Sequence, residues 1–151
     1  MVLAQGLDTA STTLRHTLGT LYRDTGTGAE YVYVLASETI TKYMACSIDS
    51  TYAALKLTKT EADKLYGVGI AMSTIASASY GWLLISGPMT SYVSTINAPA
   101  KEVALYTCAT AGALDDCSTS QTKIPGIFCS ADGVCATAEN TAVLLTRKLG
   151  V

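Results

Sequence analysis

Residues 80–87, Tyr-Gly-Trp-Leu-Leu-Ile-Ser-Gly, decide the fold class of this 151-residue chain. Aromatic and branched side chains favour a β-strand, in which successive side chains point to opposite faces. Alternation therefore places Trp82 and Leu84 on one face and Leu83 on the other. Both faces are apolar, so we expect a strand that is buried on both sides or shared with a neighbouring subunit, with Tyr80, Trp82 and Leu84 marking this core or interface strand.

The surrounding stretch, from residue 65 to residue 100, contains no charged residue. It is long enough to cross a bilayer, but Gly, Pro, Asn and many Ser and Thr residues interrupt every window of about 18 residues. We therefore interpret it as a series of strands and expect no membrane partner. Its lack of charge indicates surface that lies against other subunits.

Further strands are expected along the rest of the chain, where short apolar runs alternate with Gly, Pro, Asn and Asp about every 8–12 residues. This spacing is typical of a mainly β domain, either a small β-barrel or a sandwich. The expected strands span residues 31–35, 40–48, 68–72, 80–86, 89–95, 102–108, 123–129, 134–137 and 141–148.

One short helix is expected within residues 50–65. Thr58 or Thr60 can cap its N-terminus, where acidic residues favour the positive end of the helix dipole. Gly67 suits the C-terminal cap. Gly69 is expected to allow two strands to approach closely.

The N-terminal residues 1–28 are rich in Thr and Gly and are expected to form an extended arm on a β-rich domain of residues 29–151. Leu14, Leu18 and Leu21 have helical spacing, but the density of Thr and Gly around them opposes a helix. The arm is expected to dock onto another molecule or onto its own domain. The first residues lack a basic leader and an apolar core, so we expect no secretory signal.

The composition offers little material for catalysis. Charged residues make up 15% of the chain against a norm of about 25%, and the net charge of −2 gives no reason to expect a nucleic-acid partner. His16 is the single histidine, so any triad would need it; we interpret it as a solvated or interface residue. Asp115 and Asp116 form a turn or, alternatively, bind a hard cation. We expect no enzyme activity and no cofactor.

The five cysteines show no spacing typical of a metal site. Cys129 and Cys135 bracket a loop whose Gly133 can adopt a left-handed conformation, which would place the two cysteines opposite each other on paired strands. This pair has two interpretations. Cys129 and Cys135 form a disulfide, or their side chains face each other as two small apolar groups. Cys108 and Cys117 flank a similar turn.

Several short segments, in order, resemble capsid decoration proteins, the cement or head-stabilising proteins of tailed bacteriophages. They cover most of the chain from about residue 14 onward, and Tyr-Gly-Trp followed by an apolar strand and Gly87 is the most specific. The segments are residues 16–20 with Arg23 and Asp24, then 30–34, 67–71, 80–82 with Gly87, 111–116, 124–127 and 142–145.

This resemblance implies a small β-barrel or β-tulip-like domain with an N-terminal arm. It also implies a homotrimer on the outer face of the virion capsid, made in the host cytoplasm and bridging subunits of the major capsid protein. By position, the capsid-binding arm corresponds to about residues 2–23. Its candidate contact residues are Leu14, His16, Leu18, Leu21 and Tyr22.

Three other functions were weighed against this one. A head-fibre or adhesin-like domain would bind host glycans and would need exposed Tyr and Trp rings. A shell-forming capsid subunit is disfavoured because the chain lacks a long helix and an α/β core. An enzyme is disfavoured by the scarcity of catalytic groups.

Overall fold

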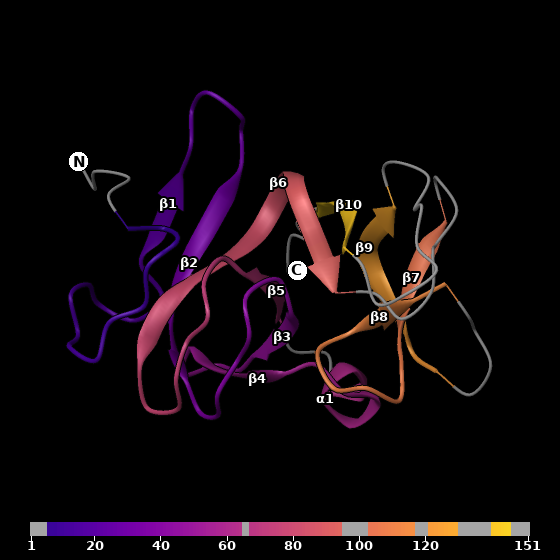
Figure 1. Ribbon diagram of the computed structural model, residues 1–151, viewed down its shortest axis with the longest axis horizontal. Helices are drawn as coiled ribbons and strands as arrows, with labels where there is room; N and C mark the ends of the chain where they lie inside the picture. The colour runs from indigo at the N-terminus through magenta and orange to yellow at the C-terminus, as the bar shows by residue number, and fades with distance from the viewer. Residues whose placement is uncertain (1–5, 65–66, 95–102, 117–120, 130–139, 146–151) are drawn as a thin grey trace.

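The computed structural model describes residues 6–64, 67–94, 103–116, 121–129 and 140–145. Within these ranges the chain forms ten strands and one short helix (Figure 1). The elements are β1 (Leu21–Arg23), β2 (Glu30–Ala36), β3 (Ala45–Ile48), β4 (Ala53–Lys56), α1 (Lys59–Asp63), β5 (Gly67–Ala71), β6 (Tyr80–Ser94), β7 (Ala104–Thr107), β8 (Leu114–Asp115), β9 (Lys123–Cys129) and β10 (Asn140–Leu145). The prediction of a mainly β fold with one short helix is confirmed.

Five of these strands close into a small barrel. Hydrogen-bonded neighbours run in the order β2-β4-β3-β5-β6, and an additional pairing of β2 with β6 completes the ring. The β2–β4 pair is parallel, whereas the other pairs in the ring are antiparallel. The predicted β-barrel is therefore present.

The barrel interior is filled by the inward side chains of these strands and of the loops between them. The packed residues are Val32, Val34, Ala36, Ile40, Cys46, Ile48, Ala54, Ala71, Ile75 and Leu83. Two glycines make room for them. A Cβ at Gly81 would lie 2.5 Å from Cδ1 of Ile75, and one at Gly69 would lie 2.9 Å from Cβ of Leu83. The close approach expected at Gly69 is thus present.

Strand β6 continues beyond the barrel into a second sheet, which Figure 1 shows on the opposite side of β6 from β1. Its first half pairs with β2 and β5, and its second half pairs with β10, which is followed by β9, β7 and β8. The change of sheet occurs at Gly87, whose φ of 102° is accessible mainly to glycine. A Cβ there would also lie 2.7 Å from Cα of Ala29.

A second apolar cluster joins the outer surface of the barrel to this second sheet. It combines barrel residues with residues of β7, β8 and β9, and its members are Ala29, Ala45, Leu57, Ile70, Leu84, Leu105, Leu114, Ile124 and Ile127. Ile70 and Leu84 lie in the charge-free stretch, as do Ala71 and Leu83 in the barrel interior. Burial within one chain therefore accounts for the missing charges at residues 69–71 and 81–84. Thr74 and residues 76–78 are uncharged but exposed, and the expected subunit surface stays a prediction.

Several element boundaries differ from those expected. Residues 53–56, in the region expected to hold the helix but before its predicted cap, form strand β4, because they pair with both β2 and β3. Helix α1 does begin after Thr58, whose side chain accepts a hydrogen bond from the N–H of Glu61. Gly67 begins β5 and is not a helix cap, since Lys64 occupies that position.

Two more strand predictions need correction. Residues 80–86 and 89–95 were expected as separate strands, but β6 is continuous through Gly87. Only Ala45–Ile48 of the expected strand at residues 40–48 is strand, while Ile40 makes an isolated bridge to Ile75. The expected strand at residues 134–137 lies outside the described residues. Among those that are described, no helix is long and apolar enough to cross a membrane.

Candidate functional site: a hollow under the N-terminal arm

The outward faces of β2 and β6 carry a cluster of aromatic rings. Tyr33 and Trp82 face each other across the two strands, with ring centroids 5.1 Å apart. Tyr80 stacks on Tyr33 at 6.1 Å with an interplanar angle of 13°. Tyr22 of β1 meets the edge of Trp82 at 6.3 Å. Aromatic pairs at these separations attract one another beyond simple burial, so the cluster is a cohesive apolar surface.

The arm, defined here as residues 6–20, lies over this aromatic face. Ser11 exchanges two backbone hydrogen bonds with Tyr80, at 2.9 and 2.8 Å. Further along, the N–H of Gly19 donates to the carbonyl of Tyr33 at 2.9 Å, and the N–H of Tyr33 donates to the carbonyl of Thr20 at 3.0 Å. As a result, Tyr33 and Trp82 each expose only 3% of their surface. The arm therefore docks onto its own barrel.

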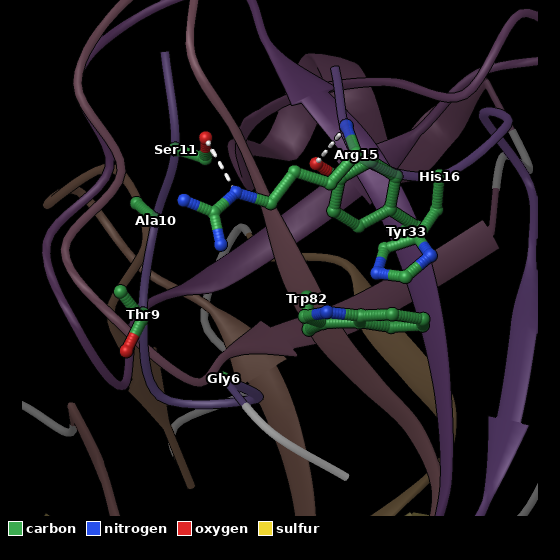
Figure 2. Close-up of a pocket in the computed structure, with 8 residues that line it drawn as sticks. All are labelled: Gly6, Thr9, Ala10, Ser11, Arg15, His16, Tyr33 and Trp82. Atoms are coloured by element: carbon green, nitrogen blue, oxygen red, sulfur yellow. Dashed lines mark hydrogen bonds between the residues drawn. The ribbon is translucent and has the colours of Figure 1, made fainter. Parts of the chain in front are cut away.

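A small hollow remains between the arm and the aromatic face (Figure 2). Its volume is about 30 Å³. Trp82 and Tyr33 form the barrel side, and the arm supplies the rest. The lining residues are Gly6, Thr9, Ala10, Ser11, Arg15, His16, Tyr33 and Trp82.

Arg15 is held in a defined orientation at this hollow. Its Nε–H donates to Oγ of Ser11 at 3.2 Å, and its backbone N–H donates to the Tyr33 hydroxyl at 3.4 Å (Figure 2). The Ser11 hydroxyl is itself fixed, because it donates to the carbonyl of Thr13 at 2.9 Å and accepts from the Thr13 N–H at 3.1 Å. The two terminal nitrogens of Arg15 form no hydrogen bond or ion pair with any described residue.

His16 packs on the same aromatic face. Its ring meets Tyr33 edge-on at 5.0 Å and lies tilted over Trp82 at 5.3 Å. The side chain is half-buried at the contact between the arm and the barrel, so it is neither freely solvated nor deep in the core. Within the described ranges, no group of three or more His, Cys, Asp or Glu side chains could hold a metal ion.

The other predicted arm residues divide into two groups. Leu18 and Tyr22 are half-buried, whereas Leu14 and Leu21 each expose 53% of their surface. Tyr52, at 40% exposure, lies against the arm, because a Cβ at Gly19 would be 2.4 Å from its ring. These three are the large exposed hydrophobic side chains of the described residues, and all belong to the arm side of the molecule.

The predicted core or interface strand lies inside a single chain. Trp82 and Leu84 are buried, on the alternating positions expected from the sequence, and Tyr80 is half-buried beside Tyr33. Leu84 packs in the cluster shared with the second sheet. Sequence reasoning did not single out Arg15, Ser11 or Tyr33, because only the register of β2 against β6 and of Ser11 against Tyr80 brings them to one place.

The cysteines can be placed only in part. Cys46 in the barrel and Cys108 after β7 are buried free thiols, and burial raises the pKa of both. Cys129 ends β9, whereas Cys135 and Cys117 lie outside the described residues. The disulfide between Cys129 and Cys135 stays a prediction.

The acidic pair expected to form a turn or bind a cation is partly built into the second sheet. Asp115 is buried at the end of β8 and pairs opposite Tyr106 of β7. The N–H of Asp116 donates to Oδ1 of Asp115 at 2.8 Å. Asp115 therefore takes part in local structure of this sheet edge.

Comparison with known proteins gives no assignment: the chain matches no protein-family model, no curated protein and no solved structure. Function is therefore inferred from the arm, the aromatic face and the hollow between them.

Proposed function

We propose that this chain is a non-enzymatic virion structural protein that binds the outer surface of a tailed-phage capsid and bridges major capsid subunits, acting as a homotrimer. The observation that carries the proposal is the position of Leu14, Leu21 and Tyr52. These three side chains expose 53%, 53% and 40% of their surface on the arm side. Apolar anchors grouped on one side of a domain are typical of a protein-binding surface.

The division between barrel and arm supports the same function. The barrel interior is closed by five strands and supplies a rigid body, while the arm adds contact surface at its edge. A protein that binds the assembled shell better than its expanded or burst states stabilises that shell by mass action. Many symmetric copies strengthen each bridge through high effective concentration.

The alternative, an adhesin-like domain that binds host glycans, has less support. Stacking of a sugar ring needs an accessible aromatic face, but the arm leaves Tyr33 and Trp82 with 3% exposure each. The hollow beside them is small, about 30 Å³ in volume. Tyr52 is the large aromatic residue that the described part of the chain exposes.

The test is co-sedimentation of the purified protein with intact phage heads. We expect the wild-type protein to bind at a fixed ratio to the major subunit and to raise the temperature at which heads rupture. The double variant Leu14→Ser/Leu21→Ser removes two exposed anchors and is expected to weaken binding at least tenfold, about 1.4 kcal/mol. Pro125→Ser, an exposed change in β9, is the matched control.

Deletion of residues 2–22 should leave a folded β-domain that no longer binds heads. Unchanged binding by this truncated domain would contradict the assignment of the arm as the capsid-binding segment. Light scattering tests the homotrimer separately, and a monomer at micromolar concentration would contradict it. Glycan binding without head binding would favour the adhesin-like alternative.

A further inference from the structure

We propose that the hollow under the arm is a carboxylate-binding site in which the guanidinium of Arg15 is the principal ligand. The inference rests on the proposed function where it names the source of the carboxylate: an Asp or Glu side chain, or a chain terminus, of the capsid subunit. The same chemistry could come from a free small anion. The two sources are separated by experiment below.

The orientation of Arg15 is the first step. Its Nε–H is occupied by Ser11 at 3.2 Å, and Ser11 is fixed to β6 through two backbone hydrogen bonds with Tyr80. The end of the guanidinium, with its two terminal nitrogens, faces the hollow between the arm and Trp82 (Figure 2). Arg15 is exposed, so its guanidinium is accessible to another molecule. A planar pair of N–H donors matches the two oxygens of a carboxylate.

The lack of an internal counter-ion is the second step. Three other cations of the described residues have acidic partners: Arg23 with Glu30, Lys56 with Glu38 and Lys64 with Glu61. Lys42 instead lies over the ring of Tyr43, 4.8 Å from its centroid. Arg15 has no carboxylate within ion-pairing distance among the described residues. An arginine whose stem is tied down and whose charged end is unpaired is suited to an acidic group from another molecule.

The lining selects among ligands. Arg15 contributes positive charge, and no lining residue is acidic, which excludes a cation. The hydroxyl protons of Ser11 and Thr9 are already donated, to the Thr13 carbonyl and to Oδ1 of Asp8, so Arg15 supplies the N–H donors. Trp82 and Tyr33 add an apolar wall. The hollow is small, about 30 Å³ in volume. A carboxylate delivered on a side chain fits this shape and charge.

The first experiment uses the isolated full-length protein and acetate as the probe. Trp82 is the single tryptophan, so its indole N–H gives one NMR signal that reports on the hollow. We expect this signal and the Arg15 Nε–H signal to shift along a saturable curve with sodium acetate, compared with sodium chloride at equal ionic strength. Arg15→Gln should abolish the saturable part. Equal responses to acetate and chloride, or an unchanged curve in Arg15→Gln, would overturn the proposal.

The second experiment asks whether the carboxylate comes from the capsid. Arg15→Gln is expected to weaken binding to heads about tenfold or more, Arg15→Lys to weaken it less, and the matched charge change Lys64→Gln on α1 to leave it unchanged. Trp82 emission confirms that each variant is folded. Acetate should compete with heads for the wild-type protein but not for Arg15→Gln.

The outcomes test the carboxylate site and the proposed capsid binding independently of each other. One outcome is that heads bind the wild type and Arg15→Gln equally while acetate still shifts the Trp82 signal of the wild type. In that case the site takes a free anion. Inorganic phosphate, used as a second probe, then shows whether the site is selective for carboxylates. If no variant binds heads but the acetate curve holds, the proposed function fails and the site stands. If phosphate binds and acetate does not, the carboxylate assignment is wrong.

Discussion

The inner and outer faces of β2 and β6 are built from alternate residues of the same two strands, yet they are covered in different ways. The inner face, with Val34 and Leu83, is enclosed by the closed barrel and packs only against apolar side chains. The outer face, with Tyr33 and Trp82, is covered by an arm that is attached by a few backbone hydrogen bonds and by the ring of His16. Similar burial is thus reached by a closed sheet on one side and by a single segment on the other.

We infer from this difference that the barrel interior provides stability, whereas the arm side provides the surface for recognition. The cluster that fills the barrel interior consists of aliphatic side chains and the Cys46 thiol, so its contribution is rigidity. The arm side combines exposed leucines, an unpaired guanidinium and a half-buried histidine in one place. Opening of the arm should therefore cost less free energy than opening of the barrel. Four measurements test whether the arm side opens more easily than the barrel.

The largest expected effect is the protection of Cys46, which lies fully buried in the barrel interior. Burial raises the pKa of its thiol, so the reactive thiolate is scarce as well as inaccessible. If the barrel opens only by global unfolding, iodoacetamide should alkylate Cys46 at least about 1,000-fold more slowly than in urea. Mass spectrometry of digested samples identifies the modified cysteine. Rapid native-state alkylation of Cys46 would show that the barrel opens locally.

The next effect is the loss of packing in Leu83→Ala. Leu83 is completely buried between β2 and β5, and a cavity at such a site costs about 2–5 kcal/mol. Leu14→Ala is the matched control on the arm, where the side chain is mostly exposed and the expected change lies within about 0.5 kcal/mol. Urea denaturation followed by Trp82 emission gives both values. Equal losses would mean that the arm is as strongly integrated as the barrel.

The sequence predicted the local strand pattern better than the pairing of distant segments, for a physical reason. Strand β9 occupies Lys123–Cys129 as expected, and Trp82 and Leu84 alternate with Leu83 as expected, because period-two patterning is a local signal. The Ala-Ala-Leu-Lys segment of β4 lies in the region where the helix was expected but before its predicted cap, and its strand structure depends on pairing with the distant strands β2 and β3.

The site depended on contacts that the sequence does not encode locally. Gly87 looked like a strand end, whereas its positive φ carries β6 from one sheet to the other. Arg15 had no motif around it. Its role follows from the register that places Ser11 opposite Tyr80, and from the arm folding back onto its own barrel.

A smaller effect is expected for His16→Ala, which tests the attachment of the arm alone. The ring contacts of His16 with Tyr33 and Trp82 should contribute about 0.5–1.5 kcal/mol. Their loss should raise acrylamide quenching of Trp82 and shift its emission to the red, since the arm no longer covers the ring fully. Protection of Cys46 should stay unchanged. A parallel loss of Cys46 protection would contradict the separation of the two faces.

The smallest effect is the acid response of two turn carboxylates, one on each side of the comparison. Asp49 caps the β3–β4 turn in the barrel, where a hydrogen bond from the Thr51 hydroxyl, followed by the N–H groups of Ala53 and Thr51, lowers its pKa. Asp24 caps the β1–β2 turn, where the Thr27 hydroxyl and then the Gly26 N–H lower its pKa. Both lowered pKa values mean that the stabilisation is complete above the unfolded-state pKa of about 4 and is lost as pH falls through the folded-state values.

The two turns should nevertheless respond differently. Because β3 and β4 belong to the closed ring, Asp49→Asn should lower the free energy of global unfolding at pH 7 and flatten its decline below about pH 4. Because β1 lies outside the ring, Asp24→Asn should leave that free energy nearly unchanged and instead speed amide exchange of Tyr22 and Asp24. Urea denaturation across pH and hydrogen exchange measure the two quantities. If Asp24→Asn lowered global stability as much as Asp49→Asn, β1 would unfold together with the barrel, and the arm side could not rearrange on a partner without loss of the fold.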